Sequence, residues 1–187
     1  DDGQIDQSDL EVEEVELVQD FTDDGIPDLL TDKSISEGVL DRRSEYHLYI
    51  GRREGGVLVY GEKPDASILS DGIQFDPLVV DVDGDGRMDL ATPSTQLGLT
   101  RIVAALFSGK MGVDLDVYRM RPDGTYPEDS DYRTRFKVEF DLKTGLVRNP
   151  AVAIADFDGD GAAELLLQEE DDALSLYPGR RGDELYG

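Results

Sequence analysis

The sequence predicts an all-β protein built from three repeated units of short antiparallel strands. An Asp-rich, Gly-containing segment occurs three times, beginning at Asp20, Asp81 and Asp156. Each copy lies between short apolar runs, and each is followed by a tyrosine-containing run with a glycine or Asp-Gly turn. Short alternating runs bounded by such turns are typical of hairpins. We therefore expect antiparallel sheets with an Asp-rich loop in each.

The flanking runs recur in the same order in all three copies. The runs before the Asp-rich segments are 15–18, 78–80 and 151–154, and the tyrosine-containing runs are 46–50, 115–118 and 174–177. The turns that follow them are at 55–56, 123–124 and 179. Each unit thus reads as strand, loop, strand, linker, strand, turn, strand, and four antiparallel strands per repeat describe a propeller blade. We assign a polar tail to residues 1–9 and blade units to about 10–70, 71–147 and 148–187.

One segment departs from the strand pattern. Within 97–109, apolar residues recur at helical spacing, at Leu99, Ile102, Val103 and Leu106, and Gly109 is suited to end a helix. The spacing predicts a short helix inserted in the second unit. A strand with a bulge is the alternative for this segment.

Composition excludes several classes of function. The 187 residues carry 43 acidic and 18 basic side chains, a formal net charge of −25, so nucleic acid is not an expected partner. There is no cysteine, hence no disulfide and no thiolate metal site. No apolar run approaches the roughly 20 residues of a membrane span. The first residues do not form a signal peptide, although a mature or trimmed chain would look the same.

The Asp-rich segments have the spacing of a calcium loop. Oxygen ligands at alternate positions 1, 3 and 5 can turn onto one point, a glycine at position 6 allows the sharp bend, position 7 offers its backbone carbonyl, and position 9 closes the shell. The predicted ligands are Asp20, Thr22, Asp24, Ile26 and Asp28 in the first loop, Asp81, Asp83, Asp85, Arg87 and Asp89 in the second, and Asp156, Asp158, Asp160, Ala162 and Glu164 in the third. The first loop has a hydroxyl at position 3, which makes it the weaker candidate.

Calcium suits these loops better than other metals. It accepts six to eight oxygens in a flexible shell, whereas magnesium prefers a strict octahedron and zinc prefers His or Cys. An EF-hand would need a Glu at position 12, and that position holds Thr31, Thr92 and Leu167. A calcium-binding β-helix is disfavoured because no Gly-Gly-x-Gly-x-Asp run occurs. Asp and Gly as plain turn residues would explain one such pair, but not the same register in repeated copies.

The loops resemble those of the FG-GAP and VCBS repeat family, whose blades form integrin-α-like β-propellers. The resemblance rests on Asp-x-Asp-Gly-Asp-Gly-x-x-Asp-Leu at 81–90 and its Glu-ending counterpart at 156–165, each after an apolar run. Phe75 is followed by Asp76 rather than Gly, and 91–93 reads Ala-Thr-Pro, so the chain is more similar to the bacterial VCBS-type branch. The resemblance implies a seven-bladed, exported propeller used for binding or as a structural module. The three units here would be part of one, completed by further blades or by a second chain.

Two functions are consistent with these features. The first is a non-catalytic calcium-binding module for extracellular adhesion or scaffolding, at the cell surface or in the periplasm, with a protein or carbohydrate partner. The second is the accessory or catalytic propeller of an exported polysaccharide-processing enzyme, in which carboxylate pairs can act as acid and base. Against the second, the clustered carboxylates are assigned as metal ligands, and no catalytic triad or phosphate-loop pattern is present. An Arg-Gly-Asp triplet at 181–183 is short enough to arise by chance.

Overall fold

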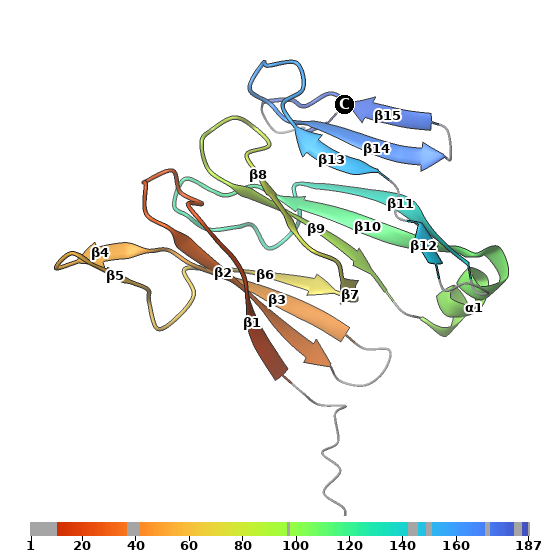
Figure 1. The fold of residues 1–187 in the computed structure, drawn as a ribbon, viewed down its shortest axis with the longest axis horizontal. Coiled ribbons are helices and arrows are strands. Elements are labelled where there is room, and N and C mark those ends of the chain that lie inside the picture. Colours follow the sequence, from red (N-terminus) through yellow and green to blue (C-terminus); the bar gives the residue numbers. More distant parts are fainter. Residues whose placement is uncertain are drawn as a thin grey trace, which may run out of the picture.

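The computed structural model describes residues 11–36, 42–96, 98–141, 146–148, 151–170, 173–181 and 185–186. These residues form three main antiparallel sheets that lie one beside the next (Figure 1). The predicted mostly-β fold is confirmed.

The first sheet has four strands in the order β1-β2-β3-β6. Its strands are β1 (Glu11–Gln19), β2 (Asp28–Ser36), β3 (Arg42–Tyr49) and β6 (Ala66–Asp71). The repeat pattern predicts that the glycine turn at 55–56 leads directly into the fourth strand, and this is wrong. The turn instead closes a separate two-stranded ribbon, β4 (Arg52–Glu54) and β5 (Val57–Val59), that projects from the sheet (Figure 1).

The second sheet is the largest. Its path is β12-β11-β10-β9-β7, and β8 also pairs with β9. The strands are β7 (Ile73–Gln74), β8 (Leu78–Val80), β9 (Asp89–Thr95), β10 (Lys110–Tyr118), β11 (Tyr132–Asp141) and β12 (Leu146–Arg148).

The third sheet has three strands in the order β13-β14-β15. They are β13 (Val152–Ala155), β14 (Glu164–Glu170) and β15 (Ala173–Tyr177). After β15, a single antiparallel bridge joins Gly179 to Tyr186 where a fourth strand was expected.

The predicted helix is present as α1 (Leu99–Ser108), between β9 and β10. The chain leaves it at Gly109, whose φ of 67° is left-handed and whose amide donates to the Ala105 carbonyl. The alternative of a bulged strand is therefore wrong for this segment. None of the helix residues is buried, and Phe107 is 91% exposed.

Two apolar cores lie between the three sheets. The core between the first and second sheets includes Phe21, Leu48 and Tyr118, and the core between the second and third includes Leu115 and Leu165. Because side chains alternate along a strand, the second sheet contributes to both cores. Neighbouring residues of β9 illustrate this: Leu90 belongs to the first core and Ala91 to the second.

The positions of the cores predict that two leucines contribute very differently to the free energy of unfolding. Leu115 on β10 is fully buried, whereas Leu174 on β15 is 59% exposed. We expect Leu115→Ala to lower the free energy of unfolding by about 2–5 kcal/mol, because it leaves a cavity between two sheets. Leu174→Ala, the matched control, should cost less than about 0.5 kcal/mol. Equal losses in chemical denaturation would contradict this assignment of the core.

Candidate metal centres

The three Asp-rich loops occupy equivalent places in the three sheets. The first loop (20–28) joins β1 to β2, the second (81–89) joins β8 to β9, and the third (156–164) joins β13 to β14. All three lie at the same end of their sheets (Figure 1). Position 9 is in each case the first residue of the strand that follows: Asp28, Asp89 and Glu164.

The loops also share their internal hydrogen bonds. The position-6 amide donates to the position-1 carboxylate, at 2.8 Å for Gly25 and Asp20, 2.9 Å for Gly86 and Asp81, and 3.0 Å for Gly161 and Asp156. The position-7 amide donates to the position-5 carboxylate, at 2.7 Å for Ile26 and Asp24, 2.9 Å for Arg87 and Asp85, and 2.8 Å for Ala162 and Asp160. All three segments therefore wrap around their carboxylates in the same way.

Position 4 distinguishes the first loop from the others. Gly84 and Gly159 have left-handed φ values of 73° and 82°, and Asp23 takes the same region at 59° in the first loop. A left-handed residue with a side chain costs roughly 1–2 kcal/mol, although Asp tolerates the region better than most. The first loop is therefore intrinsically the least favourable of the three.

The second and third loops bring their carboxylates together. One oxygen each from Asp81, Asp83 and Asp89 lies within 4.8 Å of the others in the second loop. Asp156, Asp158, Asp160 and Glu164 form the equivalent group in the third loop, where all but Glu164 are exposed. Asp85 is absent from the second group, and its carboxylate is paired with Arg87. Among the described residues, the first loop forms no such group.

Two buried oxygens at position 3 point to an additional partner. Thr22 Oγ1 in the first loop and Asp83 Oδ1 in the second are both buried and have no hydrogen-bond partner among the described residues. Buried polar atoms are normally satisfied, so an unsatisfied oxygen at the same position of two copies calls for an explanation. A hard cation held by an all-oxygen site would supply the missing contact. The residues present could therefore hold a metal ion.

The position-9 carboxylate has a structural role that the spacing did not predict. Asp89 is 1% exposed; its Oδ2 accepts from the Val82 amide and its Oδ1 from the Met120 amide, both at 2.8 Å. Asp28 does the same with the Phe21 and Gly51 amides, also at 2.8 Å. In the third loop, Phe157 N donates to Glu164 at 2.7 Å. Backbone donors carry no side-chain signature, so the roles of Gly51 and Met120 could not be predicted from the sequence.

Burial raises the pKa of three carboxyl groups in the first two loops, Asp28, Asp83 and Asp89. It raises the pKa of Asp89 to about 7, although the two backbone amides oppose the shift, and Asp83 and Asp85 nearby raise it further. Burial also raises the pKa of Asp28 and of Asp83. A cation bound beside them would favour the charged forms.

Neighbouring loops are hydrogen-bonded to one another at repeat-equivalent positions. The position-8 amide of one loop donates to the position-2 carbonyl of the loop before it: Met88 N to Phe21 O at 2.8 Å, and Ala163 N to Val82 O at 2.9 Å. The second and third loops also touch directly, since a Cβ atom on Gly84 would lie 1.8 Å from the Gly161 carbonyl oxygen. The three candidate sites thus form a connected row.

The chain matches no protein-family model, no curated protein and no solved structure. The FG-GAP and VCBS resemblance therefore stays a prediction that rests on the loops themselves. Among the described residues, no helix is long and apolar enough to cross a membrane.

Two further polar side chains, His47 and Arg52, have local partners. His47 Nδ1 lies 3.1 Å from Glu13 Oε1, and Arg52 pairs with Asp65 at 2.5 Å. Both contacts are typical of charge balance on a sheet surface. Residues 182 and 183 of the Arg-Gly-Asp triplet lie outside the described residues.

The loop contact makes Gly84 a sensitive position. We expect Gly84→Ala to destabilise the protein more than Gly159→Ala, since both residues have left-handed φ values but only Gly84 faces the neighbouring loop. The left-handed alanine should cost about 1–2 kcal/mol in both variants, and the clash should add to this only at Gly84. Thermal or urea unfolding in EDTA measures the difference. Two variants of equal stability would argue against the contact between the loops.

Proposed function

We propose that this chain is a calcium-binding module of β-propeller blades, in which the ion braces the loop between the first two strands of each blade. The observation that carries the proposal is one loop geometry, repeated three times at equivalent places in neighbouring sheets. The side chains that line it offer only oxygen ligands, which is the preference of calcium. Calcium would offset the repulsion between carboxylates that the fold holds close together.

The proposed ligands of each loop are those that its spacing predicts. In the third loop they are the side chains of Asp156, Asp158, Asp160 and Glu164 with the Ala162 carbonyl. In the second they are Asp81, Asp83, Asp85 and Asp89 with the Arg87 carbonyl, and in the first Asp20, Thr22, Asp24 and Asp28 with the Ile26 carbonyl. The full carboxylate cluster of the third loop makes it the strongest site.

The module is proposed to be non-catalytic, exported, and used for adhesion or scaffolding with a protein or carbohydrate partner. Support comes from two cavities lined by described residues, neither of which favours the polysaccharide-processing alternative. One, of about 370 Å³ between α1 and the second sheet, is lined by no carboxylate and no aromatic side chain. The other is lined by Asp71, Asp114 and Asp116 with the aromatic Tyr118, but it holds only about 130 Å³, against roughly 300–1,000 Å³ for a typical ligand pocket. Two of these carboxylates already pair with arginines, Asp114 with Arg135 and Asp116 with Arg133.

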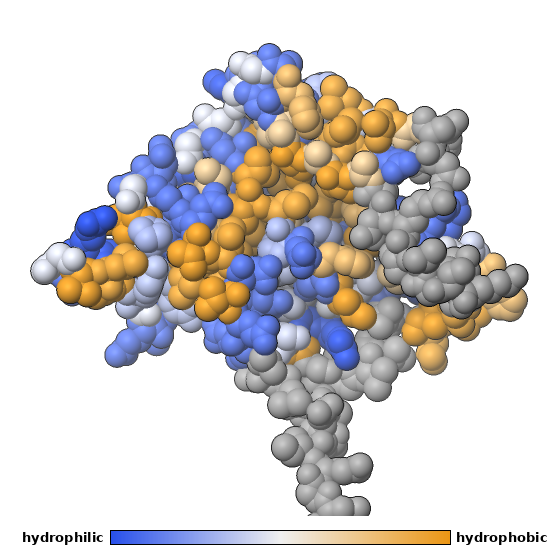
Figure 2. All heavy atoms as spheres, viewed as in Figure 1, coloured by the Kyte–Doolittle hydropathy of each residue, from blue (hydrophilic) through white to orange (hydrophobic). Residues whose placement is uncertain are grey.

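The third sheet leaves exposed some positions whose equivalents in the first two sheets are buried. The position-2 side chains of the first two loops, Phe21 and Val82, are 0% and 1% exposed because the next loop packs on them, whereas Phe157 is 52% exposed. Leu174 and Leu176 on β15 are also more than half exposed, and Figure 2 shows apolar residues gathered over this part of the molecule. We propose that another sheet of the same kind covers this face, supplied by further blades of a longer chain or by a second chain.

The central test of the proposal is calcium-dependent stability. We expect calcium to raise the melting temperature relative to EDTA, because a ligand that binds only the folded state stabilises it, by about 2.7 kcal/mol at 100 times its Kd. Magnesium should raise it less. Asp158→Asn should reduce the calcium-dependent shift, since it removes a ligand from the most complete cluster.

The control is Glu62→Gln, an exposed acidic residue outside the loops with the same change of charge. It should leave the calcium-dependent shift unchanged. Identical melting temperatures of the unmodified chain in calcium and EDTA would refute the proposed function.

The exposed face of the third sheet yields a separate prediction. We expect this chain alone to self-associate through Phe157 and Leu176, since both belong to the third sheet and its loop and each leaves about half of its apolar side chain exposed. The double variant Phe157→Ser, Leu176→Ser should shift the mass measured by size-exclusion chromatography with light scattering toward the monomer. Phe107→Ser on α1, which is also apolar and is 91% exposed, is the control and should shift it less. A chain that is monomeric at every concentration would contradict the prediction.

A further inference from the structure

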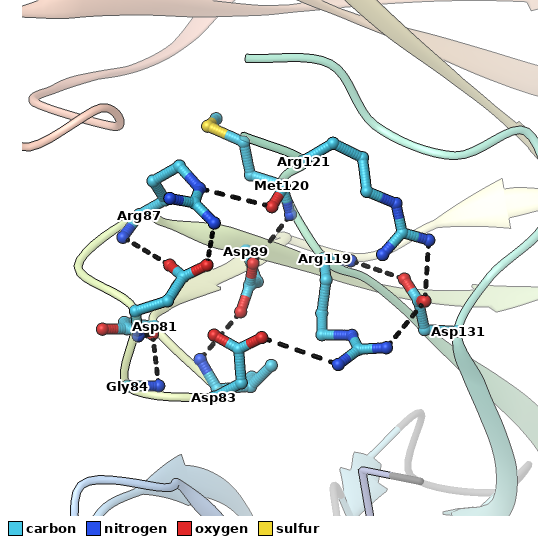
Figure 3. Close-up of polar contacts among 11 residues, drawn as sticks. Asp81, Asp83, Gly84, Arg87, Asp89, Arg119, Met120, Arg121 and Asp131 are labelled. Carbon is cyan, nitrogen blue, oxygen red and sulfur yellow. Dashed lines mark hydrogen bonds and ion pairs between the residues drawn. The ribbon is translucent and has the colours of Figure 1, made fainter. Parts of the chain in front are cut away.

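The second loop differs from the other two in carrying two arginines on its carboxylates. Arg87, at position 7, pairs through its guanidinium with Asp85 at position 5. Arg119, from the segment after β10, lies with its guanidinium 3.6 Å from the Asp83 carboxylate at position 3. Figure 3 shows Arg87 and Arg119 approaching the carboxylates of the loop from different directions. Two of the four predicted carboxylate ligands therefore already have a positive partner.

Arg119 is held in place by Asp131. Asp131 accepts hydrogen bonds from the Arg119 backbone amide at 2.9 Å and from its guanidinium at 3.2 Å. Arg121 donates to the same carboxylate at 2.9 Å (Figure 3). The Arg119 side chain is only 12% exposed and that of Asp131 only 9%. The guanidinium is thus a fixed part of the site rather than a mobile surface charge.

The third loop has no equivalent of this arrangement. Among the described residues, no lysine or arginine pairs with the carboxylates of Asp156, Asp158, Asp160 or Glu164. Arg181 does reach the loop, but its guanidinium donates to the Asp160 backbone carbonyl at 2.8 Å. Position 7 is Ala162, which has no charge to offer. The two best-formed acidic clusters therefore differ in net charge, although their backbones follow the same course.

We infer that Arg119 and Arg87 act as built-in counter-ions of the second loop, so that the third loop fills with calcium first and the second only at higher concentration. The inference rests on the proposed function. Without metal, the arginines relieve the repulsion among the carboxylates of the second loop. With metal, they compete for the oxygens of Asp83 and Asp85 and repel the incoming cation. Ligand charge is one of the quantities that sets calcium affinity over several orders of magnitude.

Calorimetric titration of the full chain with calcium tests the order of filling. We expect at least two affinity classes, with Asp158→Asn removing the tighter one and Asp83→Asn a weaker one. Arg119→Gln should tighten the weaker class by roughly 10-fold and leave the tighter class unchanged. The same variant should melt at a lower temperature than the unmodified chain in EDTA, yet gain more from calcium. This opposite response is not expected of a purely structural arginine.

Arg121→Gln is the matched control, because Arg121 carries the same charge on the same segment and contacts Asp131 but no loop carboxylate. It should leave the weaker class nearly unchanged. If Arg119→Gln fails to fold, Arg87→Gln replaces it, since substitution there keeps the backbone carbonyl. Calcium binding with equal effects of Arg119→Gln and Arg121→Gln would overturn this inference and leave the proposed function standing. An absence of calcium binding by the unmodified chain would overturn both.

Discussion

The arrangement of the loops depends on one buried carboxylate, the acidic side chain at position 9. It stands at the first residue of the strand that follows the loop in each sheet. In the first two sheets its two oxygens accept hydrogen bonds from one amide inside the loop and from one amide just after the next strand, β3 or β10. A single side chain thus closes the loop and ties it to two strands. Replacing such a group leaves buried amides unsatisfied, which costs about 1–3 kcal/mol for each donor.

From this anchor the sheets are connected in sequence. The anchored loop turns its position-2 side chain into the core and its position-2 carbonyl toward the next loop, which donates its position-8 amide. The repeat therefore specifies two things together: the internal shape of each sheet and the contact with its neighbour. A connection of this type extends by simple repetition, which is the behaviour of repeat architectures. It also means that the candidate metal centres are elements of the interface between sheets, not isolated surface loops.

Much of this could be predicted from the sequence because it depends on local spacing. The Asp and Gly positions identified all three loops, and the spacing of Leu99, Ile102 and Leu106 identified the helix. The ribbon β4–β5 was not predicted, because its glycine turn looks the same whether the returning strand joins the sheet or pairs only with its neighbour. Arg119 and Asp131 were missed for a different reason. They lie far from the second loop in sequence, and only the pairing of β9 with β10, and of β10 with β11, brings them beside it.

Helix α1 has a consequence for how such a chain can diversify. It leaves β9 at the end opposite the Asp-rich loop and returns to β10 without burying any of its own residues. Neither core includes a residue from it. We therefore expect the length and amino-acid sequence of this segment to be variable, with little effect on the sheets that flank it. A fluorescent reporter or an affinity tag inserted there would sit at the far end of the central sheet from the Asp-rich loops.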